Sequence, residues 1–227
     1  MDGSAESAAE STPSLSPADR WILSRLNRLI ERVTASIEAY EYAAAKSEVE
    51  LFFWTELADN YLELCKQRLY DPASPGHAGG RFSLSRVLLA VLKLFSPFLP
   101  YVTEEVYRVA FADLEPRQAG KTASIHTSAW PTPDPAFTDE LAEQLGRHLV
   151  EVATAVRRFK SERGLPLGSE LGGLQVWAEE SPLRERMAAA SADLMSITRA
   201  RRIELKAEPP TEGEILQAGS IRLAVLP

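Results

Sequence analysis

The sequence has very few of the side chains that build covalent links or metal sites, with one cysteine and three histidines among 227 residues. Because Cys65 is the single cysteine, an internal disulfide is excluded, as is usual for a protein of the reducing cytoplasm. Its place in an apolar helical segment predicts that the side chain is a small buried one. His77, His126 and His148 are scattered, and none is spaced with a second histidine, a cysteine or a carboxylate as a metal site requires. We therefore predict no metal site.

The sequence also lacks the glycine patterns that cradle phosphates. Its glycine pairs at 79–80 and 172–173 belong neither to a G-x-x-x-x-G-K loop nor to a G-x-G-x-x-G turn after a strand. No Ser, His and Asp set stands on a recognisable nucleophile turn, and the glutamate pairs at 104–105 and 179–180 are adjacent, so their carboxylates diverge. We predict no catalytic residues and no cofactor.

Long hydrophobic runs are absent as well, since stretches such as residues 87–92 fall far short of the roughly 20 residues of a membrane span. Residues 1–15 lack the basic start and apolar core of a signal peptide, and their Ser, Ala and Glu composition predicts a disordered leader. The formal net charge is -7, so contact with a nucleic acid would need a local basic patch. These features predict a cytoplasmic protein without a membrane partner.

Apolar residues that recur every three or four positions predict a bundle of amphipathic helices over residues 16–136. Ser16, Pro17 and Asp19 form a strong helix start, and this first helix is expected to run to about Tyr40. Prolines and glycines separate the later helices of the bundle from one another. Those are expected at residues 42–70, at 82–95, and after Pro100 to near Ala112.

The pattern changes after the bundle. A long helix that starts at Thr138 and stops at Gly164 is followed by short segments that alternate between strand and helix patterns. Strands are expected at residues 174–178, 201–206 and 220–226, and a helix at 181–197. We therefore predict a mainly α fold, in which residues 137–227 form a junction helix and a small α/β appendix to the bundle.

Aromatic side chains cluster in the second predicted helix. Phe52, Phe53 and Tyr61 lie on its apolar stripe, so they are expected in the core rather than stacked on a nucleic acid. Trp54 lies off the centre of the stripe and is expected at an interface between helices or domains. Its replacement by alanine would then cost roughly 3 kcal/mol or more.

Three basic residues of the first helix, Arg25, Arg28 and Arg32, are spaced three and four apart and share one face. Such a face could clamp phosphates. The simpler interpretation is an exposed face that Glu31 and Glu38 partly neutralise. The spacing leaves both interpretations open.

Two further basic clusters follow. Cations at the end of the long helix could bind phosphates or simply suit the negative end of the helix dipole; they are Arg157, Arg158, Lys160 and Arg163. Another cluster lies at a helix-to-strand turn, where no aromatic partner for RNA bases is near. It comprises Arg199, Arg201 and Arg202, and we interpret it as a surface turn.

Three segments, taken in order, resemble the helical anticodon-binding region of class I aminoacyl-tRNA synthetases for branched aliphatic amino acids. They are ADRWILSRLN at 18–27, FFWTELADNYLELCKQRLY at 52–70 and LKLFSPFLPYVTEEVY at 92–107, the last followed by SIHTSAWP. The second segment is more similar to the valyl than to the isoleucyl enzymes, which typically carry an arginine in place of Glu63. Residues 157–171 (RRFKSERGLPLGSEL) are similar to the junction that follows the bundle in that family.

The catalytic domain of that family, with its HIGH-type and KMSKS-type motifs, and its editing domain are missing from this sequence. The resemblance therefore implies a non-catalytic module that packs against the anticodon stem and loop of a tRNA, and the similarity to the valyl enzymes implies the valine tRNA. It would support ligation only together with a synthetase catalytic domain. The candidate phosphate ligands are Arg25, Arg28, Arg32, Lys66, Arg157 and Arg158.

An alternative function is a detached relative that has lost RNA binding and acts as a protein-interaction module. The acidic net charge favours this alternative.

Overall fold

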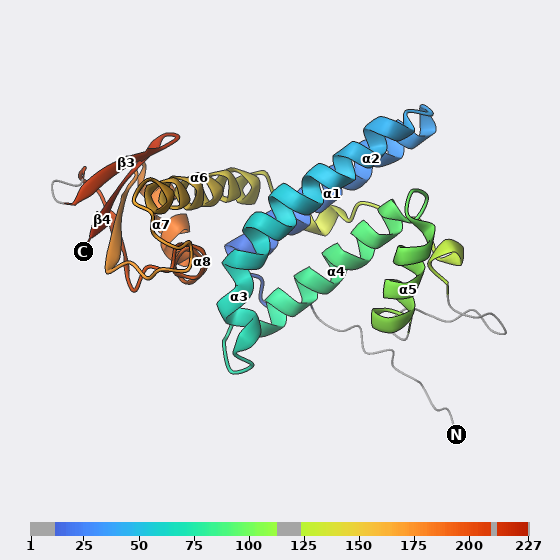
Figure 1. Ribbon diagram of the computed structural model, residues 1–227, viewed down its shortest axis with the longest axis horizontal. Helices are drawn as coiled ribbons and strands as arrows, with labels where there is room; N and C mark the ends of the chain where they lie inside the picture. Colours follow the sequence, from blue (N-terminus) through green and yellow to red (C-terminus); the bar gives the residue numbers. More distant parts are fainter. Residues whose placement is uncertain (1–11, 113–123, 210–212, 227) are drawn as a thin grey trace, which may run out of the picture.

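The computed structural model of the chain describes residues 12–112, 124–209 and 213–226. It consists of a bundle of long helices and a small α/β appendix, which the long helix α6 joins to the bundle (Figure 1). The bundle helices are α1 (Pro17–Glu38), α2 (Tyr42–Leu51), α3 (Leu62–Tyr70), α4 (His77–Phe95) and α5 (Pro100–Ala110). The later helices are α6 (Glu140–Glu162), α7 (Ser181–Ala189) and α8 (Ser191–Thr198). The predicted fold class is confirmed.

Helix α1 begins where its sequence predicts. The Ser16 hydroxyl accepts a hydrogen bond from the backbone N–H of Asp19 at 3.3 Å, and the Asp19 carboxylate accepts one from the backbone N–H of Ser16 at 2.9 Å. Pro17 occupies the first turn, where its missing N–H costs nothing. Most of residues 1–15 lie outside the described residues, but Leu15 packs against the core.

The segment expected as one helix over residues 42–70 is continuous, but its middle is a π-helix, η1 (Phe52–Tyr61). The wider turn of a π-helix changes which side chains share a face. Phe52 and Tyr61 are buried as predicted, whereas Trp54 is 61% exposed. The expectation that Trp54 is buried between helices is therefore wrong, because its ring meets Phe53 edge-on, with the centroids 4.9 Å apart, and otherwise faces solvent.

Helix α4 begins at His77, earlier than the expected residue 82, because its glycines are packing residues rather than loop residues. Both Gly79 and Gly80 are buried. A β-carbon on Gly79 would lie 2.3 Å from the carbonyl oxygen of Ser14, which brings the segment before α1 against α4. Two 3-10 turns, η2 (Ile125–Thr127) and η3 (Pro135–Phe137), lie between α5 and α6.

The appendix contains a four-stranded sheet in the order β2-β1-β4-β3. Its strands are β1 (Gly173–Trp177), β2 (Ile203–Lys206), β3 (Glu214–Ala218) and β4 (Ile221–Leu226). Strand β1 pairs parallel with β2 and antiparallel with β4, and β3 pairs antiparallel with β4. The sequence pattern did not predict β3, which is an edge strand with several exposed residues. The helix expected at residues 181–197 is divided at Ala190 into α7 and α8.

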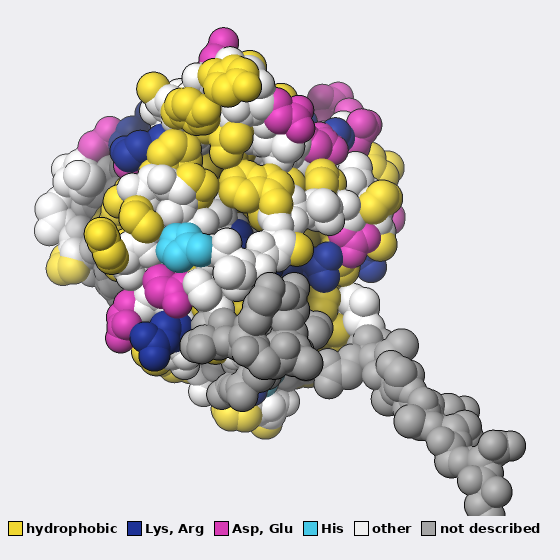
Figure 2. Space-filling view, turned by 90° about the vertical axis from the view of Figure 1, so that its right-hand side faces the viewer, with side chains coloured by type: hydrophobic (Ala, Val, Ile, Leu, Met, Phe, Trp, Pro, Cys, Tyr) yellow, Lys and Arg dark blue, Asp and Glu magenta, His cyan; other side chains and the backbone are white. Residues whose placement is uncertain are grey.

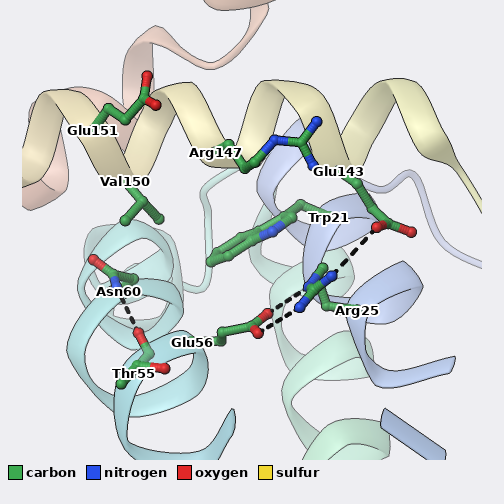
Figure 3. Close-up of a pocket in the computed structure, with 9 residues that line it drawn as sticks. All are labelled: Trp21, Arg25, Thr55, Glu56, Asn60, Glu143, Arg147, Val150 and Glu151. Carbon is green, nitrogen blue, oxygen red and sulfur yellow. Dashed lines mark hydrogen bonds and ion pairs between the residues drawn. The ribbon is translucent and has the colours of Figure 1, made fainter. Parts of the chain in front are cut away.

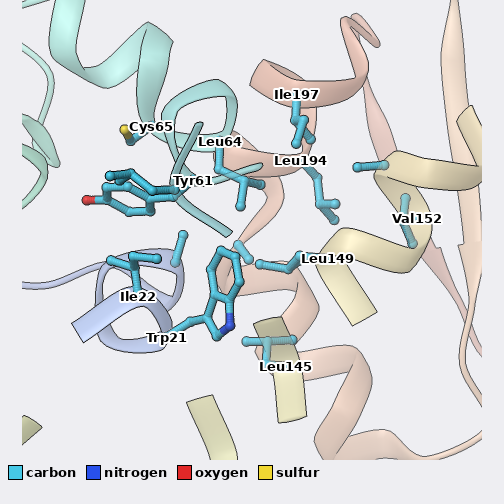
Figure 4. Packing of buried hydrophobic residues seen from close by; sticks show 14 of the residues in the cluster. Trp21, Ile22, Tyr61, Leu64, Cys65, Leu145, Leu149, Val152, Leu194 and Ile197 are labelled. Atoms are coloured by element: carbon cyan, nitrogen blue, oxygen red, sulfur yellow. The ribbon is translucent and has the colours of Figure 1, made fainter. Parts of the chain in front are cut away.

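One hydrophobic core runs from the bundle through α6 into the appendix (Figure 4). Trp21 of α1 lies against Leu145 and Leu149 of α6, close to Leu64 of α3. A β-carbon on Gly146 would lie 2.2 Å from the Trp21 ring, so α6 can approach α1 only because this residue is a glycine.

A buried polar network also joins the two parts. Arg68 of α3 binds Asp193 of α8 at 2.7 Å (Nε to Oδ1) and Asp19 of α1 at 3.1 Å (Nη2 to Oδ1). Tyr61 donates a hydrogen bond to Asp19 at 2.7 Å, and Ser16 donates one to Asp193 at 3.1 Å. Burial raises the pKa of Asp193, and the adjacent Arg68 opposes that rise. This network fixes α8 against the base of the bundle.

Candidate nucleic-acid interface

The arginines of α1 lie beside carboxylates from other elements. Arg25 forms a fork with Glu56 of η1, with both nitrogen-to-oxygen distances 2.8 Å, and its Nη1 lies 3.5 Å from Glu143 of α6 (Figure 3). The hydrogen bond and charge of Glu56 outweigh burial and raise the pKa of Arg25. This half-buried guanidinium is therefore held between two carboxylates from other elements.

Arg28 and Arg32, which share this face of α1 with Arg25, are paired in the same way. Arg28 Nε lies 3.3 Å from Glu143, with Glu140 and Glu31 at 3.7 and 3.8 Å, and Arg32 Nε lies 2.7 Å from Glu48 of α2. The sequence suggested neutralisation from within α1, whereas most of these partners come from α2 and α6. This surface, Arg25, Arg28 and Arg32 with their partners, is called the α1 face below.

Glu143 is the central anion of the α1 face. Besides the two arginines, it accepts a 2.6 Å hydrogen bond from the buried hydroxyl of Ser24. Burial alone would raise the pKa of Glu143, but the hydrogen bonds from Ser24 and Arg28 and the nearby positive charges lower it. With Trp21, Arg147 and others it lines a cavity of about 350 Å³ between α1, η1 and α6 (Figure 3).

A second basic surface lies where the bundle meets the appendix. A groove of about 720 Å³ brings together side chains from η1, α3, α6, the segment after α6 and the end of α8. We call it the junction groove; its charged lining residues are Asp59, Glu63, Lys66, Arg157, Lys160 and Arg199. It thus unites the two predicted ligands Lys66 and Arg157, which lie 91 positions apart in the sequence.

Neutral oxygens hold two of these cations. Arg157 donates to the side-chain oxygen of Asn60 at 3.1 Å and to the backbone carbonyl of Asp59. Lys160 is 1% exposed, and its Nζ donates to three backbone carbonyls, those of Leu167, Ser169 and Thr198, at 2.8, 2.7 and 3.0 Å. Burial, followed by the charge of Arg199, lowers the pKa of Lys160.

The remaining cations of these clusters differ in their partners. Lys66 pairs with Glu63 at 2.9 Å, and that hydrogen bond raises the pKa of Lys66. Arg158 lies outside the groove, with its Nε 3.8 Å from Glu162 on the same helix. The sequence thus named two of the four groove cations as candidate ligands, placed Lys160 in a cluster without choosing it, and treated Arg199 as a surface residue.

The cluster interpreted as a surface turn divides in the structure. Arg201 pairs with Glu170 at 2.8 Å, and Arg202 lies 3.6 Å from Glu204, both at exposed sites. Arg199 instead lines the junction groove. Sequence spacing could not separate the three, because a left-handed residue at the end of α8 turns the chain between them.

Exposed aromatic rings gather at the opposite end of the bundle, which Figure 2 shows with many hydrophobic side chains at the surface. Tyr40 and Tyr42 stand at the turn between α1 and α2, where their rings pack edge-on at 6.2 Å, and Tyr101 of α5 is 90% exposed. Exposed rings can stack on unpaired bases. Spacing alone gave no indication of this surface.

The described residues contain no group of three or more His, Cys, Asp and Glu side chains that could hold a metal ion. The histidines have structural neighbours instead: rings of His77 and His126 lie 3.1 Å from backbone carbonyls, and His148 lies 3.1 Å from Glu151.

The chain is similar to known proteins along most of its length. The family model described as anticodon-binding domain of tRNA ligase matches residues 19–176. Similar proteins include the valine–tRNA ligase of Methanopyrus kandleri, 40% identical over 91% of this chain and 22% of that protein, and that of Pyrococcus furiosus, 32% identical over 89% and 22%. The valine–tRNA ligase of Wolbachia pipientis is 34% identical over 86% of this chain and 22% of its own length. The chain thus spans about a fifth of the length of these relatives.

Proposed function

The chain belongs to the family of anticodon-binding domains of tRNA ligases, and we propose that it binds the anticodon arm of a tRNA without a catalytic site of its own. The family match over residues 19–176 carries this proposal. The valine–tRNA ligases among its relatives favour valine tRNA as the ligand and a synthetase catalytic domain as the partner that would perform the ligation.

The distribution of charge supports a localised contact. The chain as a whole carries a net charge of -7, which repels RNA, so binding depends on a surface where cations outnumber carboxylates. The junction groove has four cations and two carboxylates in its lining. We propose that Lys66 and Arg157 there contact backbone phosphates, and that the exposed rings at the far end of the bundle stack on loop bases.

The other predicted ligands receive a smaller role in this proposal. Arg25, Arg28 and Arg32 would contact phosphates only by exchanging their present carboxylate partners, and Arg158 would do so beside the groove. We further propose that residues 16–136 act as the RNA-binding bundle, and residues 137–227 as the part that closes the groove.

Fluorescence anisotropy of labelled valine tRNA tests the function. Titration of the chain at several salt concentrations should give saturable binding that weakens as salt rises, because each neutralised phosphate releases counterions. A tRNA for another amino acid and a double-stranded DNA of equal charge are the controls. A chain that does not saturate either tRNA at low salt would instead support the protein-interaction function, which the acidic charge and the exposed apolar end favour.

A further inference from the structure

The junction groove contains positive charge that the protein itself leaves uncompensated. Within the described residues, the hydrogen bonds of Arg157 and Lys160 all go to neutral oxygens, so no carboxylate is paired with either side chain. Within the part of the chain that the structure describes, the Arg199 side chain has no hydrogen bond or ion pair. An anionic ligand in this groove would meet the guanidinium groups of Arg157 and Arg199, which no carboxylate of the described residues occupies, and the charge of the buried Lys160 behind them.

The backbone of Arg199 adopts a conformation that is rare for a residue with a β-carbon. It has φ 60° and ψ 25°, in the left-handed region, at the position that ends α8. Glycine is the usual residue there, since a β-carbon is disfavoured in this conformation. Two backbone bonds fix the conformation, from the Arg199 N–H to the Met195 carbonyl at 2.9 Å and from the Leu171 N–H to the Arg199 carbonyl at 3.0 Å. The Arg199 side chain therefore leaves the backbone in a fixed direction, at a position that lines the groove.

We propose that Arg199 is a phosphate ligand of the junction groove and that Glu63 competes with the RNA phosphate for Lys66; this rests on the proposed tRNA-binding function. A guanidinium presents a planar fork of donors that matches two phosphate oxygens. Arg157, already oriented by η1, faces the same groove and provides a second fork. The groove therefore clamps one stretch of RNA backbone between the bundle and the appendix.

Glu63 gives the clamp an internal competitor. Its carboxylate holds Lys66 at 2.9 Å in the unbound protein, at a site exposed to solvent. An incoming phosphate must take over Lys66 and approach Glu63, which lowers affinity through both effects. Removal of the Glu63 charge should therefore strengthen binding, whereas removal of the Arg199 charge should weaken it.

The test uses Arg199→Gly, Arg199→Gln and Glu63→Gln, with Arg201→Gln as the matched control. Arg201 has the same charge two residues away, but it pairs with Glu170 outside the groove. Both Arg199 variants should bind labelled valine tRNA about fivefold more weakly and lower the salt slope by about one, since each removes one phosphate contact. Glu63→Gln should bind about twofold more tightly, and Arg201→Gln should stay within twofold of the original chain.

Thermal unfolding shows whether weaker RNA binding by an Arg199 variant reflects a lost phosphate contact or a damaged fold. Arg199→Gly should unfold at a higher temperature than Arg199→Gln, because glycine fits the left-handed conformation, so weaker RNA binding cannot then be attributed to a damaged fold. Tyr40→Gly is the control for the backbone effect, since Tyr40 also has a positive φ, 62°, but lies far from the groove.

The outcomes are distinct. If the original chain binds tRNA and the Arg199 variants match Arg201→Gln, the inference about Arg199 is overturned while the proposed function stands. If polyglutamate displaces the RNA as well as unlabelled tRNA does, the groove is a site for acidic peptides and the inference also fails. If the original chain shows no saturable binding at low salt, the proposed function fails and this inference fails with it.

Discussion

The α1 face and the Arg157–Lys160 pair of the junction groove look alike in the sequence, since each is a set of cations three or four positions apart on one helix, but their surroundings in the structure are opposite. Every arginine of the α1 face has at least one carboxylate partner within 3.3 Å. In the groove, Arg157 and Lys160 are held by neutral oxygens. Carboxylates of the protein itself compensate the first set of charges and, within the described residues, leave the second set uncompensated, which is why we propose the groove, and not the α1 face, as the RNA-binding surface.

The difference arises from contacts between distant parts of the chain. Glu143 reaches the α1 face from 118 positions beyond Arg25, and the Thr198 carbonyl reaches Lys160 from 38 positions away. Helical spacing determines which side chains share one face of one helix. It contains no information on whether a carboxylate or a carbonyl from another element will meet them.

The largest effect is expected from the network on which the groove depends. Replacement of Arg68 by methionine leaves Asp19 and Asp193 buried without their cation, so we expect the free energy of unfolding to fall by about 3–5 kcal/mol. Urea unfolding followed by circular dichroism measures it. Because the network joins α3 to α8, the variant should open the groove and leave the ion pairs of the α1 face in place.

Two further variants check that interpretation. Addition of Asp193→Asn to the Arg68→Met variant should recover part of the lost stability, since one uncompensated buried charge is removed. Lys46→Gln, which breaks an exposed pair with Glu50, should change the free energy by less than about 0.5 kcal/mol. A small loss for Arg68→Met would mean that the two parts do not depend on this network.

A smaller loss is expected when the central anion of the α1 face is neutralised. Glu143→Gln weakens its contacts with Arg25 and Arg28, and should lower the free energy of unfolding by about 1–2 kcal/mol at neutral pH. The pKa of Glu143 is lower in the folded protein, so its contribution is fully present above the unfolded value of about 4.3. That contribution disappears as pH falls through the folded value.

The pH profile provides the measurement for this residue. The difference in unfolding free energy between the original chain and Glu143→Gln should be constant from about pH 6 to 8 and shrink below about pH 4. A difference that stays the same in acid would show that the carboxylate charge contributes nothing, and that the α1 face is held by packing alone.

Much of the fold could be predicted from the sequence, and the reasons are local. The Ser16 cap, the apolar stripes and the prolines determine where most bundle helices begin and end. The π-helix η1 could not be predicted, because it has no distinct periodic signal in the sequence. Its wider turn places Trp54 toward solvent, and the expectation for this residue was therefore wrong. The edge strand β3 was missed for a similar reason, since its outward residues do not follow the pattern of a buried strand.

The candidate site was only partly predictable. Lys66 and Arg157 came from the family resemblance and from helical position, and the structure places both in one groove. Arg199 could not be chosen from Arg199, Arg201 and Arg202, because its left-handed backbone and the positions of Glu170 and Glu204 depend on the folded appendix.

A direct comparison of RNA binding at the two surfaces sharpens the contrast. Lys66→Gln with Arg157→Gln should lower the affinity for valine tRNA about tenfold and the salt slope by about two. Glutamine at Arg25, Arg28 and Arg32 removes more charge, yet it should lower the salt slope by less than one, because carboxylates already neutralise these groups. Anisotropy titrations at several salt concentrations measure both slopes, and the reverse order would identify the α1 face as the RNA-binding surface.

The smallest effect is expected at Trp54, which stands on the helical segment that serves both surfaces. The η1 segment provides Glu56 to the α1 face and Asp59 and Asn60 to the groove, but the Trp54 ring points away into solvent. Trp54→Ala should therefore lower the free energy of unfolding by less than about 1 kcal/mol. Phe52→Ala is the matched control two positions earlier, and it should cost about 3–5 kcal/mol because Phe52 is buried. Urea unfolding measures both values, and the tRNA affinity of Trp54→Ala should stay within twofold of the original chain. Since stacking of one base on an aromatic ring contributes about 1–3 kcal/mol, a loss of tenfold or more would show that RNA extends from the groove along η1 and stacks on this ring.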